Sequence, residues 1–135
     1  MNNEVLQNIK TRRSIRKYKA EQIKEDELQA VLEAGTYAPS GRGMQSPLLV
    51  AVQDEAVMNQ IVKMNAAVMG TDSNPYYDAP TVVLVFAPVD RTTWLEDGSC
   101  VVDTMMLAAH SIGLGSCWIH REREMFDTEE GKALM

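Results

Sequence analysis

The sequence predicts one domain in which helices cover a central sheet. Segments with helical periodicity alternate along the chain with short apolar runs that are typical of buried strands. The length of 135 residues suits one domain, and a chain of this size buries roughly two thirds of the surface that it exposes when unfolded. Hydrophobic residues make up 45% of the chain and charged residues 24%, the composition of an ordinary globular protein.

The N-terminal part predicts two helices separated by a basic segment. Residues 3–10 form a short helix, with Asn3 as its N-cap and an apolar stripe of Val5, Leu6 and Ile9. Residues 23–37 carry the clearest amphipathic pattern, because apolar positions recur with helical spacing at Leu28, Val31, Leu32 and Gly35. Acidic residues at 25–27 favour the start of this helix, where its dipole attracts negative charge, and Pro39 ends it.

The middle of the chain predicts two strands with a helix between them. Residues 48–52 are a short apolar run with β-branched valine and are predicted as a buried strand. Residues 55–69 repeat apolar side chains with helical spacing, and residues 71–78 form a loop. Residues 81–87 favour β-structure and show no polar alternation, so we expect a strand that is covered on both faces.

The C-terminal part predicts a long apolar helix, a third strand and a weak helix. Residues 95–112 are apolar nearly all round, so this helix is either central or at a subunit interface, and Gly113 suits its C-terminal end. Residues 116–119 are predicted as a short strand, and residues 122–135 as charged and weakly helical. Three strands make a thin sheet, so we expect something else to complete it.

Composition narrows the possible partners and the compartment. The net charge of −6 and the sequence pI near 4.9 argue against nucleic acid as the main partner. No apolar run reaches the roughly 18 residues that a membrane helix needs, and the N-terminus lacks the layout of a signal peptide. Two cysteines without metal-ligand spacing fit a reduced, cytoplasmic protein better than a disulfide framework.

One window of this acidic chain is strongly basic. Residues 10–19 hold six of the 13 basic residues and no acid. Within it, Arg12, Arg13, Ser14 and Arg16 combine guanidinium forks with a hydroxyl, the groups that bind phosphate oxygens. The window therefore predicts a site for one small anion, although a solvated basic turn would have the same charge.

Two further stretches have both a structural and a functional interpretation. Gly41 and Gly43 let the backbone approach a planar ligand, with Ser40 and Gln45 as hydrogen-bonding groups, but a helix-to-strand connection also needs glycine turns. The second stretch, residues 113–119, lacks the glycine spacing of a dinucleotide fingerprint. Its Cys117 is expected to be a buried inert thiol, since neither histidine has a spacing that implies a catalytic pair. Aromatic residues can line a flat ligand or belong to the core: Tyr76, Tyr77, Trp94 and Trp118.

Together these stretches resemble the nitroreductase family of flavoproteins. The resemblance is carried by residues 12–16, by the helix that ends at residues 38–41 with Gln45 following, by Ala79 and Pro80 before a hydrophobic strand, and by the apolar helix that runs into residues 113–119. Their order and spacing cover essentially the whole chain, and the combination is specific although each piece alone is not. The resemblance implies an α+β fold with a central, mainly antiparallel sheet, an FMN cofactor and an intertwined homodimer with FMN at the subunit interface.

The resemblance also implies roles for particular residues. Arg12, Arg13 and Ser14 would hold the phosphate and ribityl end of FMN. Arg16 would lie near the pyrimidine edge of the ring, where it stabilises negative charge on the reduced flavin. The remaining implied cofactor contacts are Pro39, Ser40 and Gly41 from the partner subunit, Gln45, and the backbone of Cys117, Trp118 and Ile119 along the ring.

The implied reaction is ping-pong transfer of electrons from NAD(P)H, through the flavin, to a small electron-poor acceptor such as a nitroaromatic or a quinone. Because the flavin supplies the chemistry, no catalytic side chain and no metal site is predicted. Family chains often have Asn where this sequence has Gly43, and they continue past the position of Met135 into a strand and an arm that embraces the partner. We therefore expect a truncated form or one that manages without the arm. A flavin-binding protein with little turnover, or an interaction protein without flavin, remains the alternative.

Overall fold

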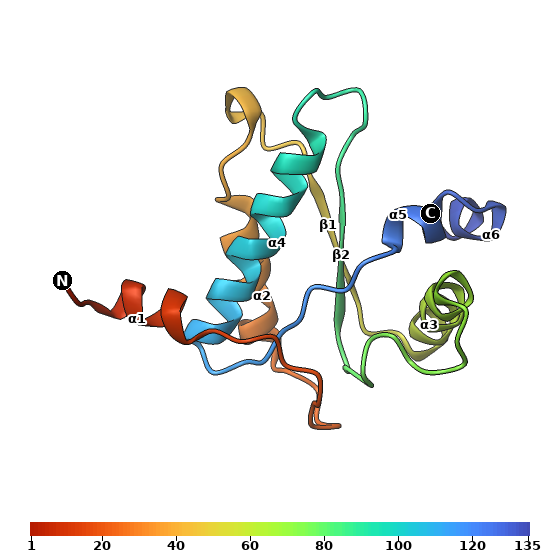
Figure 1. Ribbon diagram of the computed structural model, residues 1–135, viewed down its shortest axis with the longest axis horizontal. Helices are drawn as coiled ribbons and strands as arrows, with labels where there is room; N and C mark the ends of the chain where they lie inside the picture. Colours follow the sequence, from red (N-terminus) through yellow and green to blue (C-terminus); the bar gives the residue numbers. More distant parts are fainter. The chain divides into compact units, whose positions relative to one another are not determined.

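The protein is described by a computed structural model that covers residues 1–135 (Figure 1). The elements in order are α1 (Glu4–Thr11), α2 (Glu25–Thr36), a 3₁₀ turn (Gly41–Gly43), β1 (Leu48–Val52), α3 (Glu55–Met69), β2 (Val82–Phe86), α4 (Trp94–Ser111), α5 (Glu122–Phe126) and α6 (Glu129–Leu134). The chain divides into two compact units. The first holds residues 1–15, 23–50 and 85–117, and the second holds residues 16–22, 51–84 and 118–135. None of the helices is both long enough and apolar enough to span a membrane.

The β-structure is a two-stranded antiparallel sheet of β1 and β2, and its combination with helices confirms the α+β prediction. The predicted strand at residues 116–119 is wrong, because Ser116 forms only an isolated parallel bridge with Ser14 and residues 117–119 are not in a strand. Within β2, only Leu84 is buried, so the expected cover on both faces is not present within this chain.

The first unit is built on the packing of α2 against α4, which lie side by side (Figure 1). Their contact buries Leu28 and Val31 from α2 and Val101, Met105 and Ala109 from α4. Gly35 lies at the tightest point, since an added Cβ would be 2.8 Å from both Leu49 and Met105. The amphipathic pattern of residues 23–37 therefore identified the buried face correctly, although α2 itself is two residues shorter at its start.

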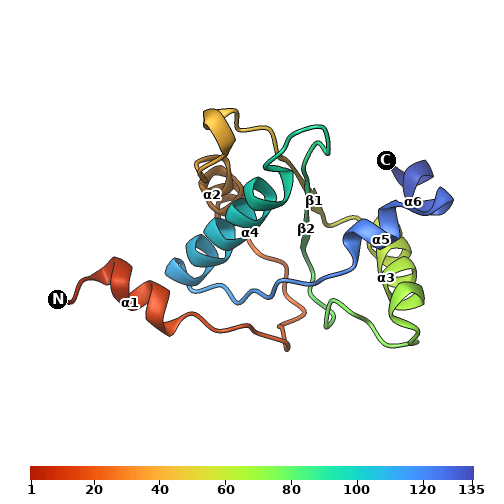
Figure 2. The same cartoon turned by 45° about the horizontal axis from the view of Figure 1, so that its top comes forward.

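α1 contacts the C-terminal part of α4 (Figure 2). The Asn3 side chain caps α1 as predicted, accepting from the Leu6 N–H at 2.9 Å. From the middle of α1, the Asn8 amide donates to the carbonyl of Leu107 at 2.9 Å, and at its end Thr11 Oγ1 lies 2.9 Å from His110 Nε2. These contacts fix the segment that leads into the basic window.

α4 buries one face and leaves the rest half-buried or exposed. Leu95 is 59% exposed, so the apolar circumference of this helix is not buried within the chain. Gly113 ends the helix as predicted, with a φ of 86° that favours glycine. The Gly113 N–H donates to the His110 carbonyl and the Leu114 N–H to the Ala109 carbonyl, which is the double hydrogen bond of a Schellman motif.

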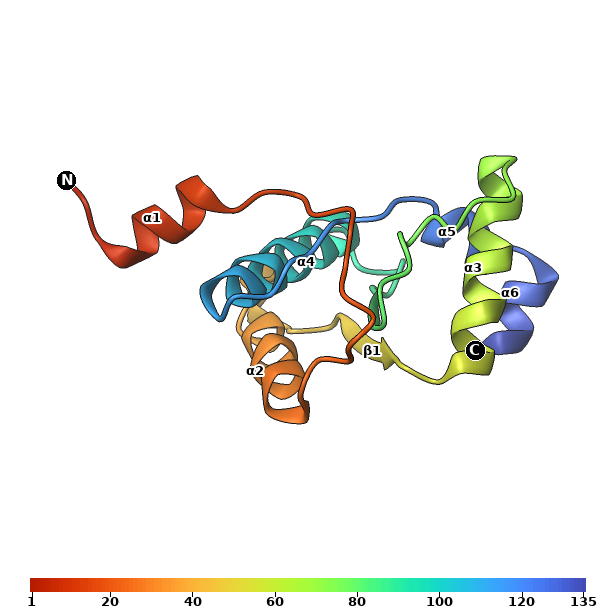
Figure 3. The same cartoon turned by 90° about the horizontal axis from the view of Figure 1, so that it is seen from below.

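In the second unit, α5 packs against α3, and α6 packs against α5 (Figure 3). Its apolar centre includes Ile61 and Met64 of α3 and Met125 of α5. α3 has the predicted bounds because Asp54 caps its start, accepting from the Val57 N–H at 3.0 Å, and Gly70 ends it with a φ of 72°.

Candidate functional site

The basic window begins where α1 ends, and Arg12 is the cap residue there. The Arg12 backbone N–H donates to the Asn8 carbonyl at 3.1 Å, after which the chain turns away in an extended conformation. Its Nη1 atom is buried and has no hydrogen-bond partner in the protein. A buried charged donor without a partner is costly, so this atom is suited to an anionic ligand that would accept from it.

Arg13 is used differently from Arg12. Its Nη1 donates to the carbonyl of Lys10 at 2.8 Å and to that of Arg12 at 2.7 Å. These carbonyls lie at the C-terminal end of α1, where a cation interacts favourably with the helix dipole. The structure therefore gives this nitrogen of Arg13 a role in ending the helix, and the predicted contact with phosphate stays a prediction.

Two of the sequence stretches lie side by side in the first unit. Ser14 and Ser116 form a parallel bridge, in which the Ile15 N–H donates to the Ser116 carbonyl at 2.9 Å. An added Cβ at Gly115 would lie 3.1 Å from the Ile15 side chain, so glycine allows this close approach. Ser14 is exposed, and Cys117 is half-buried and is not part of a disulfide. The residues around Arg12 and those around Ser116 thus form one local surface.

Residues 40–45, which we call the 40–45 loop, are stabilised by hydrogen bonds of the Ser40 and Gln45 side chains. Ser40 Oγ accepts from the Gln45 N–H at 2.9 Å and donates to Gln45 Oε1. Gln45 Nε2 donates to the carbonyls of Thr36 and Ala38. The two side chains predicted to bind the cofactor therefore bind each other and the loop backbone, a role that the sequence pattern did not reveal.

α4 keeps the 40–45 loop away from the Arg12 surface within one chain. The Gly41 N–H bonds to Asp97 in the first turns of α4, whereas α1 bonds to Leu107 and His110 near its other end (Figure 1). At 1.5 Å per residue, these positions are separated by roughly 15–20 Å along the helix axis. A single copy of the first unit therefore does not bring Ser40 and Gly41 to Arg12 and Ser14.

The other predicted contacts belong to the second unit. Arg16 is exposed, Trp118 is 47% exposed and Ile119 is half-buried. Their assignment to the cofactor stays a prediction.

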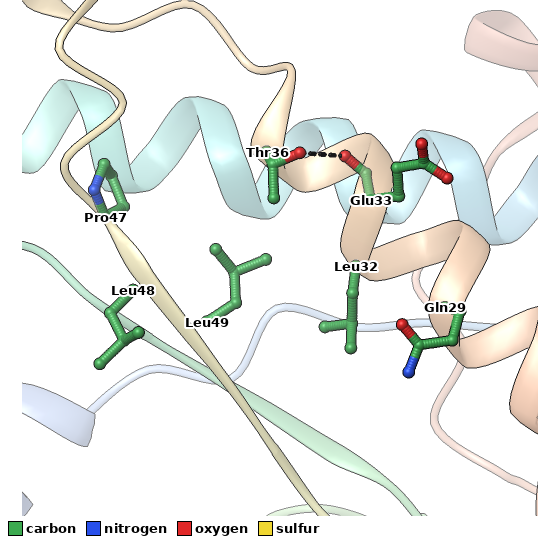
Figure 4. Close-up of a pocket in the computed structure, with 7 residues that line it drawn as sticks. All are labelled: Gln29, Leu32, Glu33, Thr36, Pro47, Leu48 and Leu49. Carbon is green, nitrogen blue, oxygen red and sulfur yellow. Dashed lines mark hydrogen bonds between the residues drawn. The ribbon is translucent and has the colours of Figure 1, made fainter.

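A groove of about 430 Å³ lies beside α2 in the first unit, with the start of β1 along it (Figure 4). Its apolar side chains are Leu32, Pro47, Leu48 and Leu49. At its edge, Thr36 Oγ1 donates to the Glu33 carbonyl at 2.7 Å. None of the residues predicted to contact the cofactor lines this groove, so it is a feature separate from the predicted site.

A buried polar network in the second unit was not predicted. Asn65 of α3 is fully buried, and its Nδ2 lies within 3.1–3.3 Å of Tyr76 OH, Glu122 Oε1 and the His120 carbonyl. Its Oδ1 accepts from Arg121 Nε at 2.9 Å, and Tyr76 OH donates to Glu122 Oε1 at 3.2 Å. Tyr76 is thus part of the core. The available signal was an asparagine inside the apolar stripe of α3, between Met64 and Ala66.

Burial controls the protonation of this network. It raises the pKa of the Glu122 carboxyl to about 7, although its hydrogen bonds and the Arg121 guanidinium act in the opposite direction. Burial, together with the negative charge of Glu122, also raises the pKa of Tyr76 well above its usual range. Arg121 itself has a φ of 86°, so its backbone lies in the left-handed region beside these groups.

Comparison with known proteins settles the family. The model of the nitroreductase family matches residues 9–124, most of the chain. The chain belongs to the nitroreductase family. This nitroreductase-family chain is 30% identical over 123 residues to a Methanothermobacter thermautotrophicus protein whose name describes an NADH dehydrogenase or NAD(P)H nitroreductase. The match covers 85% of the chain, which spans 60% of the length of that relative.

Two solved nitroreductases carry bound FMN. The Bacteroides fragilis structure has a TM-score of 0.91 and 35% identity, and the match covers 98% of this nitroreductase-family chain and 78% of that chain. The Desulfitobacterium hafniense structure has a TM-score of 0.75 and 29% identity, with 84% and 68% covered. These matches agree with the nitroreductase-like fold predicted from the sequence.

Proposed function

We propose that this chain binds FMN and belongs to an FMN-dependent oxidoreductase. The observation that carries the proposal is the buried Arg12 Nη1, which lacks a protein partner and adjoins the bridge between Ser14 and Ser116. The bound FMN of two similar structures supports the choice of cofactor. An anionic phosphate would supply the missing acceptor for Arg12, and the exposed Ser14 hydroxyl would donate a second hydrogen bond.

The chain's own residues would hold and orient the cofactor. Arg12, Arg13 and Ser14 would bind the phosphate and ribityl end, while one nitrogen of Arg13 fixes the end of α1. Arg16 would contact the pyrimidine edge of the ring. Gly115 would keep the backbone of Cys117 close to the same surface, with Trp118 and Ile119 following. FMN, when bound, would supply the two-electron chemistry, so no side chain need act as acid or base.

The site is proposed to be shared between two copies of the chain. α4 separates the 40–45 loop from Arg12 by roughly 15–20 Å, so Pro39, Ser40 and Gly41 would reach the cofactor of a second copy. Exposed apolar side chains on the first unit are consistent with a homodimer: Val5, Ile9, Tyr37, Met44, Leu48 and Leu95. We further propose a cytoplasmic enzyme with NAD(P)H as donor, a ping-pong mechanism and a nitroaromatic, a quinone or a similar small molecule as acceptor.

The test is the double variant Arg12→Ala with Ser14→Ala. We expect FMN affinity to fall about 100-fold, since two hydrogen bonds to a charged phosphate contribute roughly 1.5 kcal/mol or more each. The apoprotein should remain as stable as the wild type, because Arg12 Nη1 has no protein partner to lose. The measurement is FMN titration by fluorescence quenching, with thermal unfolding of both apoproteins.

The matched control is Arg123→Ala with Ser73→Ala, which removes the same residue types from exposed positions of the second unit. This control should bind FMN as the wild type does. Normal flavin retention in the Arg12 and Ser14 variant would rule out the phosphate site. In the wild type, bleaching of the bound flavin by NADH would distinguish an enzyme from a flavin-binding protein with little turnover.

A further inference from the structure

The 40–45 loop is held in an unfavourable backbone conformation. Three of its residues have positive φ: Arg42 at 57°, Gly43 at 63° and Gln45 at 48°. Only glycine adopts this region without a steric penalty. The next residue, Ser46, has a buried hydroxyl without a partner. A simple connection from α2 to β1 would relax away from such features, and strain of this kind is retained mainly at functional sites.

A buried carboxylate holds the loop in place. Asp97 is 3% exposed, and its Oδ1 accepts from the Gly41 N–H at 2.8 Å. Its Oδ2 accepts from Thr93 Oγ1 at 3.0 Å, so both carboxylate oxygens are used. Asp97 lies near the N-terminal end of α4, where the helix dipole favours a negative charge.

The loop also fits closely against the same end of α4. A Cβ added at Gly41 would lie 2.2 Å from Thr93 Oγ1, so no other residue fits this contact without movement. Beyond Gly41 the loop presents Arg42, Gly43 and Met44 to solvent. The strained part is therefore fixed at one end by Asp97 and at the other by the side chain of Gln45.

We propose that Asp97 is a positioning residue for the cofactor, acting through the 40–45 loop. It holds Gly41 and the strained turn that follows in the one conformation that can contact the FMN of a second copy. The inference rests on the proposed function. It assigns to Asp97 a role in ligand binding that its distance from the Arg12 surface would not suggest.

The experiment compares Asp97→Ala and Asp97→Asn with Asp103→Asn, an exposed aspartate on the same helix. FMN affinity and the visible circular dichroism of the bound flavin are measured, together with hydrogen exchange of the Gly41 amide in the apoprotein. We expect Asp97→Ala to weaken FMN binding at least tenfold, to change the flavin spectrum and to speed Gly41 exchange. Asp97→Asn should restore most of the affinity, because its amide oxygen still accepts from Gly41.

A second comparison separates positioning from stability. Met105→Ala removes a buried side chain from the same helix, about two turns beyond Asp97, and lowers stability. If it weakens FMN binding and alters the flavin spectrum as much as Asp97→Ala does, the role of Asp97 is structural and the inference is overturned. Unchanged FMN affinity and flavin spectrum in Asp97→Ala would overturn the inference about Asp97 but leave the proposed function standing. A wild type that binds no FMN would overturn both.

Discussion

Replacing Asn65 with leucine is expected to lower the free energy of unfolding by about 3–5 kcal/mol. The leucine has the same branched shape as the asparagine, with a somewhat larger volume, but it would remove every hydrogen bond that Asn65 makes at the centre of the second unit. Arg121 Nε would lose its acceptor, and the His120 carbonyl would lose a donor, at a position where Asn65 is fully buried. Urea denaturation of wild type and variant at pH 7 measures the loss.

The control is Asn59→Leu, the same substitution at an exposed position of α3. It should change stability by less than about 0.5 kcal/mol. A similar small effect for Asn65→Leu would contradict the network, since it would mean that its polar groups find other partners. A double-mutant cycle with Glu122 would then test whether the two residues are coupled.

Glu122→Gln is expected to stabilise the protein at alkaline pH and to have little effect at acid pH. The pKa of Glu122 is about 7 in the fold and 4.5 as the ordinary value, so between these values the folded chain holds a proton that the unfolded chain releases. Stability should therefore fall as the pH rises through this range, and the loss is complete above pH 7. Between pH 5 and pH 8 the wild type should lose about 2–3 kcal/mol, which the neutral glutamine would not lose.

Urea denaturation of both proteins across this pH range measures the difference. Glu124→Gln is the matched control, because it makes the same change at an exposed position of α5. Its stability should follow the wild type at every pH. Parallel curves for wild type and Glu122→Gln would show that Glu122 is not buried as a proton-binding group.

Local signals in the sequence were sufficient for most helices and for the two strands. β1 and α3 have the predicted bounds because turn and cap residues flank each of them, with Asp54 at the start of α3 and Gly70 at its end. β2 differs from its prediction by one residue at each end. These elements are determined by neighbouring residues, which a single sequence displays.

The strand predicted at residues 116–119 shows where this reasoning fails. An apolar run that includes Trp118 and Ile119 has the right composition, but a strand also needs a partner along its whole length. Here only Ser116 pairs, with Ser14, about a hundred residues earlier in the chain. Pairing over that separation is a property of the fold, and composition does not encode it.

The sequence predicted some parts of the candidate site and not others. The sequence indicated the residues around Arg12 and around Ser116, and the structure brings these stretches together. The sequence did not reveal that Ser40 and Gln45 bind each other, because that contact depends on an unusual backbone conformation. It also did not reveal that Asp97 holds Gly41, because those two residues are 56 positions apart in the chain. The network around Asn65 was missed for the same reason, since its link to Glu122 spans 57 residues.

The length of α4 has a genetic consequence if the cofactor is shared between two copies. Each binding site would take its phosphate-binding end from one copy and its 40–45 loop from the other. In a mixed dimer of an Arg12 variant and an Asp97 variant, one site would then carry both defects and the other site neither. Two inactive alleles would complement each other and restore up to half of the sites, whereas two alleles affected at the same end of α4 would not.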